Sequence, residues 1–144
     1  MSFFSRLEAY ARQVDSLLCV GLAPHPQDLP AQSGAAARDY CLRLVKATAE
    51  YAAAFKPNIA FFEAAGTDGL TALAEVIRYV PDDRIVILDA KRGDIGSTAQ
   101  AYARAAFEVW GADAITVSPY LGRDSVTPFL DFPGKMVFLL CHTS

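Results

Sequence analysis

Short apolar runs alternate with helix-forming segments along this chain, and that alternation constrains the fold more than any other feature. The run Ile85-Val-Ile-Leu88 is rich in β-branched residues and is typical of a strand buried on both faces of a parallel sheet. Segments with helical spacing lie between five such runs, which predicts right-handed βαβ units. We therefore expect an α/β protein built on a parallel sheet.

The expected elements follow one another without a linker, repeat or low-complexity tract. A helix is predicted over residues 3–14, and a proline-rich loop over about 24–34. The five strands are expected at 17–22, 54–59, 84–89, 113–118 and 135–141, and the helices between them at 35–53, 66–79, 97–110 and 122–130.

Polar residues at the ends of these strands favour a (βα)8 TIM-type barrel over a doubly wound sheet. Lys56, Asp89, Lys91 and Ser144 all fall at or near carboxyl ends of strands, where barrels place active sites drawn from several strands. Doubly wound sheets usually carry a glycine-rich phosphate turn after the first strand, and the segment 21–26 is not of that kind. A barrel takes about 250 residues. We therefore expect residues 1–144 to be the N-terminal part of one barrel domain, supplying about its first five strands.

Composition and charge exclude several classes of protein. The net charge of −3 gives no reason to expect nucleic-acid binding. No apolar run approaches the ~20 residues that span a bilayer, and the start has no signal-peptide pattern, so we expect a cytoplasmic protein. Cys19, Cys41 and Cys141 are predicted to be buried free thiols, and no Cys or His spacing nominates a metal site.

The charged residues that end the third strand carry the chemistry. Alternation along a strand places Asp89 and Lys91 on one face, and Lys56 stands on another otherwise apolar strand. Together with Asp94 they can form a network of alternating charge, in which opposite charges 4 Å apart attract by roughly 4 kcal/mol. Such a network keeps both lysines protonated, so that one could donate a proton to a carbanion. An ion network that only stabilises the fold is the alternative, and these residues alone leave the reaction class open.

Four motifs, in order, resemble the orotidine 5′-monophosphate decarboxylase superfamily. The segment Asp89-Ala-Lys-Arg-Gly-Asp-Ile95 is similar to its DxKxxD signature, and residues 88–102 resemble the bacterial type 2 branch of the decarboxylases. The other matches to that branch are Phe55-Lys-Pro-Asn58 with Phe61-Phe-Glu63, then Ser118-Pro-Tyr-Leu-Gly122, and Cys141-His-Thr-Ser144.

This resemblance implies a specific reaction, the cofactor-free decarboxylation of orotidine 5′-monophosphate to UMP in pyrimidine biosynthesis. Lys91 would be the proton donor, Asp89 would lie against the substrate carboxylate, and Lys56 would link the ribose region to Asp89. The resemblance further implies a homodimer with shared active sites. Its remaining site residues would be Asp94, Ile95 and Thr98, which serve the neighbouring subunit's site, and Ser144, which binds the pyrimidine ring.

Two departures from the family pattern affect binding. The family commonly has an aspartate where this chain has Ala23, so weaker substrate binding is expected. Its phosphate-gripping arginine lies on later strands, beyond these 144 residues. Because remote phosphate contacts supply binding energy for catalysis, we expect the 144-residue piece alone to be nearly inactive.

Two other functions remain open on the sequence. A magnesium-dependent phosphate-sugar decarboxylase or aldolase of the same superfamily would need an acidic metal ligand after strand two, where this chain has Lys56-Pro-Asn58. A non-catalytic barrel fragment acting in binding or assembly is the alternative from another class.

Overall fold

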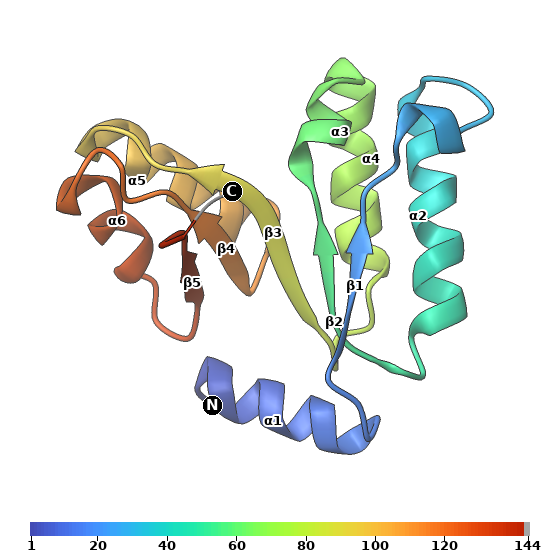
Figure 1. Ribbon diagram of the computed structural model, residues 1–144, viewed down its shortest axis with the longest axis horizontal. Helices are drawn as coiled ribbons and strands as arrows, with labels where there is room; N and C mark the ends of the chain where they lie inside the picture. Colours follow the sequence, from blue (N-terminus) through green and yellow to red (C-terminus); the bar gives the residue numbers. More distant parts are fainter. Residues whose placement is uncertain (143–144) are drawn as a thin grey trace.

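Five parallel strands form one curved sheet in the order β1-β2-β3-β4-β5, the α/β arrangement expected from the sequence (Figure 1). The computed structural model describes residues 1–142. The strands are β1 (Leu18–Leu22), β2 (Ala52–Pro57), β3 (Ile85–Arg92), β4 (Ala114–Val117) and β5 (Met136–Leu139). The helices are α1 (Phe3–Gln13), α2 (Gly34–Thr48), α3 (Ile59–Glu63), α4 (Gly66–Tyr79), α5 (Gly96–Arg104) and α6 (Thr127–Leu130), with short 3-10 turns at Pro26–Asp28 and Arg123–Ser125.

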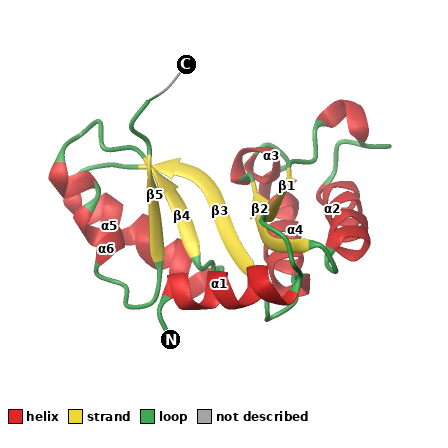
Figure 2. Ribbon diagram, turned by 60° about the horizontal axis from the view of Figure 1, so that its bottom comes forward, coloured by secondary structure: helices red, strands yellow, loops and turns green. Residues whose placement is uncertain are grey.

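The convex face of the sheet is covered by helices and contains the larger core. Phe55, Leu88 and Ile115 are fully buried on this face, one from each of the three central strands. Helices α2 and α4 pack against each other over β1 and β2, while α5 and α6 cover β4 and β5 (Figure 2). Burial on this side holds the five strands in register.

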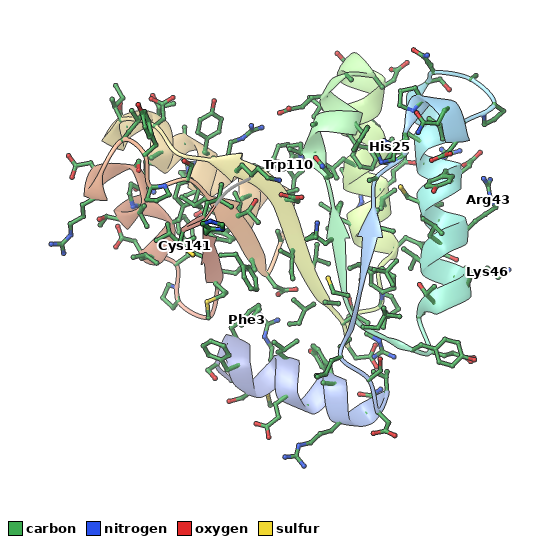
Figure 3. All side chains as sticks on the ribbon, viewed as in Figure 1. Phe3, His25, Arg43, Lys46, Trp110 and Cys141 are labelled. Carbon is green, nitrogen blue, oxygen red and sulfur yellow. The ribbon has the colours of Figure 1, made fainter. Side chains whose placement is uncertain are left out.

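The concave face is apolar at one end and polar at the other. Ala54, Ile85 and Ala114 alternate with the convex-face residues and form a second core with Phe3 of α1. Helix α1 crosses the end of the sheet at which the strands begin, and Phe3 reaches up from it toward the strands (Figure 3). The polar residues lie at the opposite end, where the strands finish.

Buried charges fasten α1 to the sheet. Arg6 Nη1 donates to Asp113 Oδ1 at 2.8 Å and Nη2 to the Gly134 carbonyl at 3.3 Å. The other oxygen of Asp113 accepts a bond of 2.9 Å from the Val86 amide at the start of β3. This chain of contacts closes the apolar end of the concave face.

The structure corrects several boundaries predicted from sequence. The helix expected over 35–53 ends at Thr48, and Ala52 already begins β2. The alanines at 52–54 favour a helix locally, and their burial in the sheet overrides that preference. Helix α3 was not predicted, and the π-helical turn Ala105–Val109 ends the helix expected over 97–110. Strand β3 continues to Arg92, three residues past its predicted end.

The prediction that all three cysteines are buried was wrong for two of them. Cys41 is fully buried between α2 and its neighbours, whereas Cys19 and Cys141 are exposed on the outer strand β1 and just after β5. An apolar run does not reveal that its strand lies at the edge of the described sheet. All three thiols are free. No helix within residues 1–142 has the length and hydropathy needed to cross a bilayer.

The contrast between two arginines of α1 tests how this helix is held. Arg6→Ala should lower the free energy of unfolding by about 1–3 kcal/mol, because it removes the partner of a buried carboxylate. Arg12→Ala removes only an exposed pair with Glu8 on the same helix and should cost less than about 0.5 kcal/mol. Urea unfolding measures both, and equal losses would contradict this account.

Candidate active site

Two lysines flank one buried carboxylate at the polar end of the concave face. Lys56 of β2 donates from Nζ to Asp89 Oδ2 at 3.1 Å, and Lys91 of β3 donates from Nζ to Asp89 Oδ1 at 2.5 Å. The side chain of Asp89 is 9% exposed, that of Lys56 40% and that of Lys91 55%. The carboxylate is therefore enclosed, while the two ammonium groups remain open to a bound molecule.

The surroundings of Asp89 keep it ionised. Burial acts to raise its pKa, but hydrogen bonds from Lys91 and Lys56, the charge of Lys56 and a hydrogen bond from Thr116 outweigh burial. The net effect lowers the pKa of the Asp89 carboxyl below its ordinary value. A fixed negative charge between two ammonium groups can hold a proton donor in place and repel a second anion.

The contact between Asp89 and Lys91 depends on a bend in β3. Lys91 has φ of 47°, in the left-handed region that non-glycine residues rarely adopt. The β3–β4 register shifts between Leu88 and Arg92, so the bend interrupts regular pairing. Strict alternation predicted the shared face correctly, but the direct bond arises from this irregular backbone.

Thr116 of β4 is a site residue that sequence reasoning missed. Its hydroxyl donates to Asp89 Oδ1 at 3.0 Å and accepts the backbone N–H groups of Ala90 and Lys91 at 3.0 and 2.9 Å. A signal for it was available: Thr116 is the one polar residue of the strand Ala114–Val117, next to the strand that carries Asp89.

The segment after Lys91 is anchored on both sides. Arg92 forms an ion pair with Glu63 of α3, and its guanidinium lies over the ring of Tyr102 of α5, 4.9 Å from the centroid. At Gly93 an added Cβ would lie 2.3 Å from the Ser118 carbonyl oxygen, so only glycine permits this approach of β3 to β4.

The structure does not bring Asp94, Ile95 or Thr98 to the lysines. Asp94 is half-buried, and its carboxylate accepts the Ile95 amide at 2.7 Å; it pairs with no lysine or arginine in residues 1–142. Ile95 is 65% exposed, and Thr98 lies in the first turn of α5. Three of the four charges expected in the network, those of Lys56, Asp89 and Lys91, are therefore together, and Asp94 forms no ion pair with them in the described residues. Ser144 lies outside the described residues.

Ala23 brings no carboxylate to the end of β1, the strand that pairs with the Lys56 strand β2. Ala23 directly follows β1 and is half-buried, and its carbonyl accepts the His25 amide. In the described part of the chain, Asp89 is the one acidic residue in ion-pair contact with Lys56.

Comparison with known proteins gives this arrangement a family. The family model described as "Orotidine 5'-phosphate decarboxylase / HUMPS family" matches residues 16–144. This chain belongs to that family. A curated orotidine 5′-phosphate decarboxylase of Methylibium petroleiphilum is 55% identical over 148 residues, covering 100% of this chain and 53% of the relative. One from Roseiflexus sp. is 52% identical, with 100% and 54% covered.

Solved structures of the orotidine 5′-phosphate decarboxylase family confirm the fold. The structure of Leishmania donovani OMP decarboxylase superposes with a TM-score of 0.90 at 56% identity, covering 100% of this chain and 55% of that one. The Leishmania donovani UMP synthase structure gives 0.91 at 56% identity, with 100% and 31% covered. The chain thus spans about half the length of the curated relatives it matches, in keeping with five strands of a (βα)8 barrel.

Acid unfolding tests the charge balance at Asp89. Because its pKa is lower in the folded than in the unfolded chain, its stabilising contribution is present above the ordinary aspartate pKa and is lost as pH falls through the folded value. Asp89→Asn should therefore flatten the decrease in the free energy of unfolding as pH falls below about 5 and through the ordinary aspartate pKa.

Asp124→Asn is the matched control, because Asp124 is exposed and forms no ion pair in the described chain. Its urea-unfolding curves should keep the wild-type dependence on pH. Parallel curves for Asp89→Asn and wild type would show that the carboxylate has no stabilising partners.

Proposed function

We propose that this chain supplies the catalytic half of an orotidine 5′-monophosphate decarboxylase, which converts the substrate to UMP and CO2. The arrangement Lys56–Asp89–Lys91 carries the proposal, since it combines a proton donor with a fixed carboxylate at the carboxyl ends of strands. The curated relatives that match the whole chain at about half identity bear the same name. Within the complete protein, residues 1–144 form the N-terminal part of one barrel domain.

The chemistry requires the ring carbon to lose CO2 and gain a proton. The bond between ring and carboxylate breaks, CO2 departs, and the electron pair stays on the ring carbon. Lys91 Nζ, held by Asp89 Oδ1 and 55% exposed, gives its proton to that carbon and is reprotonated from water. Asp89 lies against the departing carboxylate, so its charge opposes the bound substrate more than the neutral product. Lys56 donates to Oδ2 of Asp89 and so holds the other oxygen of that side chain.

A second copy of the protein completes each site in this proposal. Asp94 and Ile95 follow Lys91 closely in sequence but form no hydrogen bond or ion pair with either lysine in the described chain, and Ile95 exposes an apolar side chain. We assign Asp94, Ile95 and Thr98 to the partner subunit's site in a homodimer, and Ser144 to the pyrimidine ring. We propose that the reaction needs no organic cofactor or metal and that the protein binds no nucleic acid. We also propose a cytoplasmic location.

The magnesium-dependent alternative receives less support. At the end of β2 it needs an acidic ligand, and the structure has the ammonium of Lys56 there, already paired with Asp89. Asn58, the next polar residue, uses its side-chain oxygen to cap α3 through the Ala60 amide.

Turnover by a completed barrel tests the proposal. A hybrid that joins this chain to the unmatched half of the Methylibium relative should convert orotidine 5′-monophosphate to UMP, followed by ultraviolet absorbance, and should do so in EDTA. Lys91→Ala should lower kcat by at least about 100-fold in a hybrid that still folds, since the proton donor is lost.

Lys46→Ala is the matched control, because Lys46 is exposed in the last turn of α2, on the outer, helical layer (Figure 3), and forms no ion pair in the described chain. It should keep wild-type turnover. A folded hybrid that releases no CO2, or one in which Lys91→Ala is as active as wild type, contradicts the proposed function.

Subunit mixing tests the shared site separately. Hybrids carrying Asp94→Ala or Lys91→Ala should each be nearly inactive alone. Mixed dimers should recover activity, because one of their two composite sites keeps both residues. If mass spectrometry verifies that subunits have exchanged and the mixed dimers are still inactive, Asp94 acts in its own subunit's site.

A further inference from the structure

The hydroxyl of Thr116 joins the carboxylate and the backbone bend of the site at a single atom. It donates its one proton to Asp89 Oδ1, and its two lone pairs accept the Ala90 and Lys91 amides. A hydroxyl has no further hydrogen-bonding capacity, so every position on this oxygen is used. The three bonds, at 2.9–3.0 Å, have ordinary lengths.

This oxygen supports a backbone conformation that β3 could not hold alone. The left-handed conformation of Lys91 is unfavourable for a residue with a side chain. The bend also removes the Ala90 and Lys91 amides from regular pairing with β4, whose register with β3 shifts here. Thr116 is their hydrogen-bond acceptor, replacing the missing backbone carbonyls.

The same oxygen fixes where the proton donor points. Asp89 Oδ1 accepts both Thr116 and Lys91 Nζ, while Oδ2 accepts Lys56. The carboxylate is thus held from the β4 side by a neutral donor and from the open side by two cations. Rotation of the Asp89 carboxylate would break its hydrogen bond with Thr116 and would displace Lys91 Nζ, which is bonded to the same oxygen.

We propose that Thr116 is a positioning residue of the decarboxylase site, holding the Asp89 carboxylate and the Lys91 bend in the geometry that aims the ammonium at the substrate. It touches neither substrate nor reacting atoms and acts through Asp89 and Lys91. The kinetic part of this inference rests on the proposed function, whereas its structural part does not.

The kinetic test uses the active hybrid with a pair of variants. Thr116→Val keeps the shape and removes the hydroxyl, so kcat should fall about 10- to 100-fold, the scale expected for a misplaced catalytic group, while KM changes little. Thr116→Ser restores the hydroxyl and should recover most of kcat. Thr48→Val is the control, because the Thr48 hydroxyl donates only to the Leu44 carbonyl within α2. Wild-type kcat in Thr116→Val overturns the proposal.

Two NMR measurements, one on the wild type and one comparing it with the variants, need no turnover. Amide hydrogen exchange by NMR should show the Ala90 and Lys91 protons protected, and a carbon-detected titration should show the Asp89 pKa higher in Thr116→Val than in wild type and Thr116→Ser. Lys56 and Lys91 are the charged groups that face Asp89, and both are retained in these variants. Fast exchange at both amides in the wild type overturns the inference even if the variants fail to fold. An inactive wild-type hybrid with protected amides would instead contradict the proposed function alone.

Discussion

The enclosure of one carboxylate between two ammonium groups is the interaction on which this structure's function depends. Asp89 is nearly buried, and an ionised group there is costly unless it is paired. Lys56, Lys91 and Thr116 together satisfy it from two neighbouring strands and from β3 itself. For folding alone, an apolar residue would serve as well at this position. The cluster is therefore better explained by chemistry than by stability.

The fold prepares this site by dividing the concave face of the sheet. Its apolar end is filled by α1, which Arg6 and Asp113 fasten to the starts of β3 and β4. At its polar end lie the carboxyl ends of all the parallel strands, so residues far apart in sequence meet there. The Arg92–Glu63 pair and the close approach at Gly93 then set where β3 ends. The apolar core beneath α1 and the charged cluster at Asp89 therefore occupy opposite ends of the same face.

The five strands could be predicted from the sequence, and so could the shared face of Asp89 and Lys91, because side chains alternate along a strand. The proximity of Lys56 to them could also be predicted, because parallel strands end at the same edge of the sheet. The bend at Lys91 could not be predicted, because it depends on a hydrogen bond from the next strand and not on local propensity. Thr116 was missed although it is the one polar residue of its strand, because the local sequence does not show that its hydroxyl meets Asp89 of the neighbouring strand. The end of α2 was misplaced because alanine is a strong helix former, so that Ala52 and Ala53, which begin the buried strand β2, fitted the predicted helix. The exposure of Cys19 is a property of the sheet edge, which no single strand reveals.

The direct measurement of the central claim is the titration of the Asp89 carboxyl by carbon-detected NMR in wild type, Lys56→Ala and Lys91→Ala. The account predicts a wild-type midpoint below that of an ordinary aspartate, raised by each substitution because each removes a donor and a positive charge. A wild-type midpoint at or above the ordinary value, unmoved by either substitution, would contradict it.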